Sequence, residues 1–147
     1  MKRLLLISVF ALTGCAQIAA LRDEAARNEQ TATVYPQNYR AEILSLMRSY
    51  LNDPRQVRDA FISEPQVRTF DGVRRYVVCL RYNARKSDGR YAGIKENLVL
   101  FRFGRLERLV DPVRPASETR EAREAAEVRE HCRDMELKPF SELEKLS

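Results

Sequence analysis

Residues 67–82 read VRTFDGVRRYVVCLRY, and this stretch decides the fold class. On both sides of Asp71-Gly72, apolar residues recur at every second position, which is the period of a β-strand. Asp-Gly between two such runs is typical of a tight hairpin, because both central residues of the turn need a positive φ. The stretch therefore predicts two antiparallel strands joined by a two-residue turn.

Two further strands are expected downstream. A second Asp-Gly pair, Asp88-Gly89, precedes residues 96–103, which read ENLVLFRF. Gly104 then turns the chain into residues 106–110, and Asp111-Pro112 ends that run. Four consecutive strands with short connections predict an antiparallel meander.

The segment before these strands has the three-and-four spacing of helices. Apolar residues in 39–51 predict an amphipathic helix that ends at residues 52–54 and covers one face of the meander. Residues 55–62, RQVRDAFI, also have apolar residues at helical spacing and indicate a short second helix before Pro65.

A C-terminal helix is predicted over residues 117–135, with Ser117 as its N-cap. Its narrow apolar stripe consists of Ala122, Ala125, Val128, Cys132 and Met135. The predicted fold class is therefore α+β in two layers, an N-terminal helix packed on a four-stranded antiparallel meander, followed by a C-terminal helix.

The first residues have the layout of a secretory signal peptide. The basic stretch Met1-Lys2-Arg3 precedes LLLISVFAL at residues 4–12, and Thr13-Gly14-Cys15 follows. The apolar stretch covers at most thirteen residues, 4–16. A helix that crosses a bilayer needs about 20 residues, so this segment is expected to direct export and then to be removed.

Residues 12–15, LTGC, resemble the lipobox of bacterial lipoproteins. The resemblance implies cleavage between Gly14 and Cys15, an S-diacylglycerol thioether on Cys15 and an N-acyl group on its new amine. Two alternatives remain open, namely an ordinary signal peptide cut elsewhere and an apolar N-terminal helix of a cytosolic protein. Ala16 rather than Asp follows the cysteine, which in enterobacterial lipoproteins favours the outer membrane over the inner membrane.

The chain is expected to have three parts: a signal peptide at 1–14, a flexible tether at 15–37 with few large apolar residues, and a single α+β domain at 38–147. At 147 residues, the chain is too short for a multidomain enzyme. Removing the signal peptide takes two basic residues, Lys2 and Arg3, and no acid, so the formal charge falls from +5 to +3.

The chain has three cysteines, and lipidation of Cys15 would leave Cys79 and Cys132 beyond the cytoplasmic reductants. Cys79 lies in a predicted strand and Cys132 on the apolar stripe of the last helix. We predict a disulfide between them that links the C-terminal helix to the sheet. Two buried thiols are the alternative. A redox pair is disfavoured because there is no Cys-x-x-Cys spacing.

No catalytic or metal-binding motif is visible in the sequence, and the expected sets of catalytic and metal-ligating residues are both empty. His131, the only histidine, lies beside Cys132 on the predicted helix, where adjacent residues point in different directions. We expect His131 to be a surface residue. Hydrolysis by a pair of carboxylates would require a cleft that brings two of them together.

Basic residues concentrate between 40 and 114, where Lys and Arg number 16 against 9 acids. Arginine binds phosphate and carboxylate groups through two parallel hydrogen bonds. These residues predict a patch for an anionic ligand formed by Arg74, Arg75, Arg81, Arg85 and Arg102. The alternative is an arginine-rich composition without function. Nucleic acid is not an expected partner in the cell envelope.

Most of residues 39–147 resemble small uncharacterised lipoproteins of rhizobial-type alphaproteobacteria. The segments that carry this resemblance are YRAEI at 39–43, YLNDP at 50–54, RDAFI at 58–62, RYVVC at 75–79 and PFSELE at 139–144. The resemblance implies no catalytic residue.

The expected function is that of a membrane-anchored envelope lipoprotein with a non-enzymatic role in binding or complex assembly. Its expected location is the outer membrane, facing the periplasm. Its expected partners are the membrane and an envelope protein or anionic envelope polymer, and no cofactor beyond the covalent lipid is expected. The alternative is a small periplasmic hydrolase or cell-wall-modifying accessory enzyme. A cleft with two convergent carboxylates would favour that alternative, and a flat apolar patch would favour binding.

Overall fold

The computed structural model describes residues 13–112 and 120–146, and it divides the chain into two units that meet at residues 31 and 32. The smaller unit contains α1 (Thr13–Ala32), in which the described side chains of residues 18–27 are all exposed. Most of the predicted tether is thus helical. In the described part of the chain, no helix combines the length and the apolar character needed to cross a membrane.

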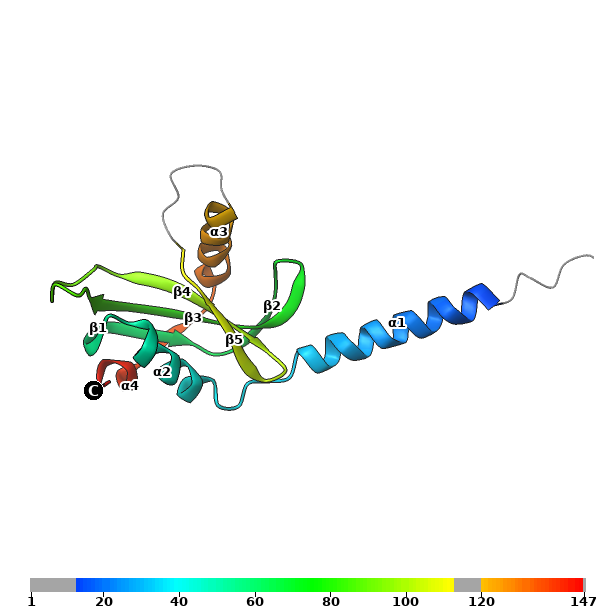
Figure 1. The fold of residues 1–147 in the computed structure, drawn as a ribbon, viewed down its shortest axis with the longest axis horizontal. Helices are drawn as coiled ribbons and strands as arrows, with labels where there is room; N and C mark the ends of the chain where they lie inside the picture. Colours follow the sequence, from blue (N-terminus) through cyan, green and yellow to red (C-terminus); the bar gives the residue numbers. More distant parts are fainter. Residues whose placement is uncertain (1–12, 113–119, 147) are drawn as a thin grey trace, which may run out of the picture. The chain divides into compact units, whose positions relative to one another are not determined.

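A long bent hairpin forms the centre of the larger unit (Figure 1). β1 (Asp53–Ser63) and β2 (Gln66–Phe70) follow each other along one edge of β3 (Val73–Arg85), both antiparallel to it. Asp71 and Gly72 have φ values of 52° and 71°, which confirms the predicted turn. Where Pro65 interrupts the ladder, the Ser63 hydroxyl accepts a hydrogen bond from the backbone N–H of Cys79 at 2.9 Å.

The other strands complete a sheet of six. β4 (Lys95–Arg102) pairs with β3, β5 (Arg105–Val110) pairs with β4, and β6 (Leu137–Pro139) pairs with β1, all antiparallel. The predicted four-stranded meander is present as β2 to β5. The strand number was wrong because β1 and β6 extend the sheet beyond β3, in the order β5-β4-β3-β1-β6.

The predicted short helix at 55–62 is wrong, because this segment is the middle of β1. Register shifts accompany Gln56 and Asp59, whose φ values are 60° and 52°. The extra residues of these bulges place the buried side chains of Val57 and Ala60 three positions apart. This spacing imitates one turn of a helix, which explains the misinterpretation.

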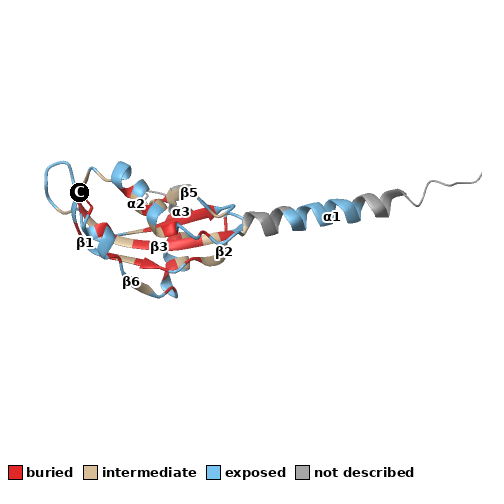
Figure 2. Ribbon diagram, turned by 90° about the horizontal axis from the view of Figure 1, so that it is seen from below, coloured by how far each residue is buried: buried red, intermediate tan, exposed pale blue. Residues whose placement is uncertain are grey.

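The sheet has a hydrophobic core on each face, and Figure 2 shows buried residues along its central strands. Val78 and Leu80 belong to the core that α2 (Tyr39–Tyr50) and α4 (Ser141–Glu144) complete. Val77 and Cys79 belong to the core that α3 (Arg120–Arg133) completes. The predicted two-layer arrangement is therefore wrong. Because side chains alternate between the faces of β3, helices cover both sides.

The predicted disulfide is confirmed. Cys79 of β3 and Cys132 of α3 are bonded, with their Cα atoms 5.7 Å apart. Val128 and Met135 lie beside the bridge in the same core, as the apolar stripe predicted. The predicted N-cap Ser117 lies outside the described residues.

The C-terminal segment also binds the bulged strand. The backbone N–H of Phe140 donates to the Ala60 carbonyl oxygen at 2.8 Å, and the Ala60 N–H donates to Glu144 Oε1 at 3.0 Å. Backbone groups next to the bulge thus find their partners 80 residues or more away in sequence. Phe140 and Leu143 have no exposed surface.

Candidate functional site: a pocket lined by tyrosine and lysine

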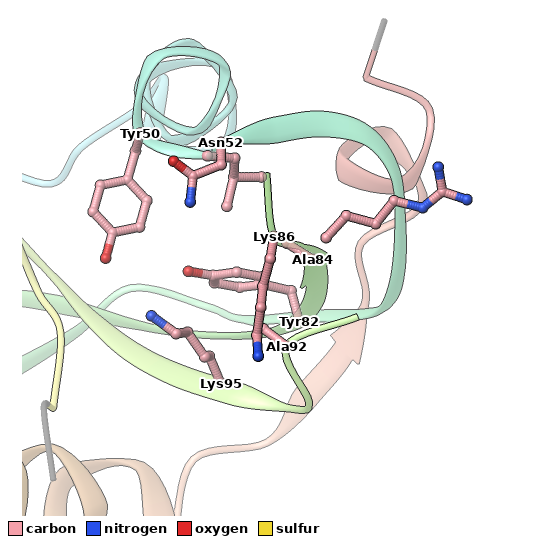
Figure 3. A pocket seen from close by; sticks show the side chains of 9 residues that line it. Tyr50, Asn52, Tyr82, Ala84, Lys86, Ala92 and Lys95 are labelled. Carbon is pink, nitrogen blue, oxygen red and sulfur yellow. The ribbon is translucent and has the colours of Figure 1, made fainter. Parts of the chain in front are cut away.

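A pocket of about 370 Å³ lies where the end of α2 meets the last part of β3 and the first residue of β4 (Figure 3). This volume lies in the range of small-molecule sites. The pocket is lined by Tyr50, Leu51, Asn52, Tyr82, Ala84, Arg85, Lys86, Ala92 and Lys95.

Tyr82 is the most buried large side chain of the pocket, with 1% of its surface exposed. Its hydroxyl has no hydrogen-bond partner among the described residues. A buried polar group without a partner typically costs about 1–3 kcal/mol. Burial, with smaller contributions from Tyr50 and Asp111, raises the pKa of the Tyr82 phenol. The hydroxyl therefore stays protonated at neutral pH and can donate to a ligand oxygen.

Tyr50 and Lys95 converge on one carboxylate beside the pocket. The Tyr50 hydroxyl donates to Asp111 Oδ2, and Lys95 Nζ donates to the same oxygen at 3.0 Å. Burial and the hydrogen bond to Asp111 raise the pKa of Tyr50. In Figure 3 the hydroxyls of Tyr50 and Tyr82 and the ammonium of Lys95 lie on the same side of the pocket. Asp111, which the sequence analysis placed at the end of a strand, thus holds the side chains of Tyr50 and Lys95 in position beside the pocket.

The Asp111 carboxyl is expected to make stability depend on pH. Burial alone raises its pKa, but the hydrogen bonds from Tyr50 and Lys95 outweigh burial, so the net pKa lies below 3.8. A lowered folded-state pKa stabilises the fold above the unfolded-state pKa, and this contribution disappears as the pH falls through the folded-state value. Asp111→Asn should therefore cost about 1.5 kcal/mol at pH 7.

Urea unfolding of wild type and Asp111→Asn at pH 7 and near pH 2.5 checks this expectation. The difference between the two proteins should shrink at the acidic pH, because the contribution of the carboxylate falls as the pH drops below the unfolded-state pKa. A difference of the same size at both pH values would contradict the role given to the charge of Asp111.

The charge of the pocket lining is positive. Arg85, Lys86 and Lys95 are cationic, and no lining residue is acidic. Asp111 balances Lys95 from just outside the lining. The site therefore offers a net positive environment of moderate strength to an anionic group.

The five arginines of the predicted patch are distributed along the sheet. Arg74 and Arg85 are eleven residues apart on β3, which corresponds to about 36 Å of extended strand. Arg75 is 7% exposed and forms an ion pair with Glu107 across the sheet. The structure therefore does not gather the five around one point.

Three of the patch residues contact aromatic rings. The Arg81 guanidinium lies 4.7 Å from the ring centre of Phe61, and that of Arg102 lies 4.9 Å from Phe103. Arg85 lies 5.5 Å from the Tyr91 ring and is the only one of the five that lines the pocket. Each of these three arginines thus contacts a different aromatic ring.

The other candidate residues of the sequence analysis do not line the pocket. Gly14 and Cys15 are in the first turn of α1, and their side chains are outside the described set. His131 is half-buried, with its ring 5.8 Å from that of Phe70. In the ranges that the structure describes, no three His, Cys, Asp or Glu residues are placed to hold a metal ion.

Sequence reasoning missed the pocket. Tyr82 reads as a core residue of its strand, and Asn52 as the end of a helix. The available signal was a set of polar residues at or next to the ends of elements, Asn52, Lys86, Lys95 and Asp111. The first three line the pocket, and Asp111 accepts a hydrogen bond from Lys95. Comparison with protein-family models, with curated proteins and with solved structures finds no match for this chain.

Proposed function

We propose that this protein is a lipid-anchored envelope protein that acts by binding, with the pocket as its ligand site. The observation that carries the binding role is the buried hydroxyl of Tyr82, which has no partner among the described residues and lies in a cationic pocket. Two features support the envelope location: the lipobox-like residues 12–15 and the Cys79–Cys132 disulfide. Structural disulfides persist in oxidising compartments and are rare in the cytosol.

The ligand group that best fits the pocket is a single carboxylate. The protonated Tyr82 hydroxyl and the ammonium of Lys86 can each donate to an anionic oxygen. Lys95 contributes less because Asp111 Oδ2 already accepts its hydrogen bond at 3.0 Å. The negative charge of Asp111 also disfavours a dianion such as phosphate.

Such carboxylates are abundant in the proposed location. An outer-membrane anchor would present the domain to the periplasm, where cell-wall peptides and acidic proteins carry exposed carboxylates. We place the anchor in the outer membrane because Ala16 follows Cys15. The proposal requires no cofactor besides the covalent lipid.

The alternative, a periplasmic hydrolase, needs two carboxylates facing one cleft. The described lining of the pocket has no carboxylate, and Asp111 beside it is held by Tyr50 and Lys95. The pocket geometry therefore favours binding over carboxylate-based hydrolysis.

Titration with N-acetyl-D-alanine, followed by amide chemical shifts, tests the proposal. The backbone signals of Ala84 and Ala92 in the pocket should shift on binding. Tyr82→Phe removes only the hydroxyl, and loss of one hydrogen bond to a charged group should weaken binding about tenfold. Tyr35→Phe is the matched control, because Tyr35 lies at the other end of the sheet against Tyr76.

Two outcomes would contradict the carboxylate site. One is equal affinity of wild type and Tyr82→Phe for N-acetyl-D-alanine. The other is equal or tighter binding of the neutral N-acetyl-D-alaninamide or of inorganic phosphate. Shifts that avoid Ala84 and Ala92 would place the binding site outside the pocket.

A further inference from the structure

Two hairpin turns lie toward the end of the sheet opposite the pocket. Tyr76 near the start of β3 pairs with Phe101 near the end of β4, so the turns at Asp71-Gly72 and Phe103-Gly104 share this end. Residues 34 and 35 lie against the second turn, since a side chain at Gly104 would meet Val34 at 3.1 Å. We call the region of this second turn, formed by residues 34–35 and 102–105, the hairpin end.

The hairpin end exposes apolar side chains. The exposed fractions are 53% for Phe103, 48% for Val34 and 38% for Tyr35. These are three of the eight exposed large apolar residues in the described part of the chain. Three exposed apolar side chains thus lie around one turn, which is typical of a contact surface.

The backbone conformation of Phe103 is unfavourable for a bulky residue. Its φ is 53° and that of Gly104 is 72°, so the pair forms the same kind of turn as Asp71-Gly72. Such turns favour Asn or Asp at the first central position, and a bulky residue at positive φ is strained. The exposed ring gains little from packing, so the fold does not account for an aromatic residue there. Strained exposed residues of this kind are typical of functional sites.

Arginines flank this apolar tip. Arg102 contacts the Phe103 ring, and the Arg105 side chain is 81% exposed while it pairs with Glu42 at 3.0 Å. These two cations stand against one neighbouring acid, Glu42. Aromatic rings with neighbouring arginines are typical of groups that sit at the headgroup level of an anionic bilayer.

We propose that the hairpin end docks on the surface of an anionic lipid bilayer. Phe103 enters the boundary between headgroups and acyl chains, and Arg102 and Arg105 contact lipid phosphates. The docking proposal rests on the proposed lipid anchor in one respect only, namely that the anchor would hold the domain near a membrane. Cys15 and Thr33 are 18 positions apart in the sequence, so the anchor would keep the domain within about 60 Å of the membrane and raise the effective concentration of lipid at the tip.

A single tryptophan can report on this contact, because the chain has no Trp. The full lipidated chain carrying Phe103→Trp is reconstituted into vesicles of phosphatidylglycerol and phosphatidylcholine with brominated acyl chains. Its fluorescence should shift to shorter wavelength and be quenched by roughly half relative to vesicles without bromine, because the indole reaches the acyl boundary. Ile94→Trp is the matched control. Ile94 is 61% exposed just before β4, at the opposite end of the sheet, and should remain unquenched.

The outcomes separate this proposal from the lipid anchor. If the protein floats with the vesicles but the indole of Phe103→Trp emits and quenches like that of the Ile94→Trp control, the docking proposal is overturned and the anchor stands. If the protein does not float, the anchor fails, and quenching of Phe103→Trp by excess vesicles would then still support docking. Equal quenching in vesicles with and without phosphatidylglycerol would overturn the role of the arginines.

Discussion

Replacing Cys15 by Ser is expected to abolish acyl labelling of the protein when a host that processes lipoproteins grows on labelled palmitate. The serine hydroxyl cannot form the thioether that would carry diacylglycerol, so the proposed acyl chains would be absent from the variant. Each buried methylene contributes about 0.8 kcal/mol to membrane binding, and stable anchoring needs two chains. The loss of acyl labelling and of membrane anchoring should therefore be complete rather than partial.

The same variant should keep residues 1–14, because the lipobox that residues 12–15 resemble has a cysteine as the residue that becomes the new N-terminus. Mass analysis separates the two forms. The variant with both Cys79 and Cys132 replaced by Ala is the control and should be labelled like wild type. Continued labelling of Cys15→Ser would refute the lipoprotein assignment.

Removing the disulfide should have the largest effect on stability. Cys79 and Cys132 are 53 residues apart, and closing a loop of that length stabilises a fold by about 4 kcal/mol on the chain-entropy model. Small domains have a total stability of about 5–15 kcal/mol, so this loss is a large share. The double variant Cys79→Ala, Cys132→Ala should therefore unfold at much lower urea concentration than wild type.

Reductant provides the internal control for this measurement. Wild type in dithiothreitol should lose most of the same free energy, whereas the double variant should not respond to it. A loss below about 1 kcal/mol in the double variant would show that packing of Val128 and Met135, rather than the bridge, holds α3 on the sheet.

Much of the fold could be predicted because its signals are local. The Asp71-Gly72 turn depends on two adjacent residues that tolerate positive φ, and both have it in the structure. The stripe of α3 depends on the helical period, and Val128 and Cys132 are buried as it requires. The disulfide was predictable because setting Cys15 aside as the predicted lipid site left two cysteines. Each of them was expected on an apolar face.

The errors came from elements whose local sequence pattern is misleading or absent. β1 has a helical spacing of apolar residues because bulges at Gln56 and Asp59 change its period. β6 is three residues long and ends in Pro139, so it has no period to detect. Both elements exist because they pair with strands that are distant in sequence.

The candidate site was even less accessible to sequence reasoning. Tyr50, Tyr82 and Asp111 come from three separate elements, and each has an ordinary local role as helix end, core residue or strand end. The arginines stood out by number, yet Arg75 is paired with Glu107 and Arg81 contacts the Phe61 ring. Counting charges cannot show which of them already have partners.

The sequence by itself determined the central hairpins, the amphipathic helices and the pairing of the two domain cysteines, because each depends on spacing or composition over a few residues. Only the tertiary structure decided that helices cover both faces of the sheet, that the Tyr82 hydroxyl finds no partner among the described residues around its cationic pocket, and that Phe103 lies exposed beside Val34. Those features depend on which distant segments meet, and long-range packing and hydrogen bonding select that arrangement.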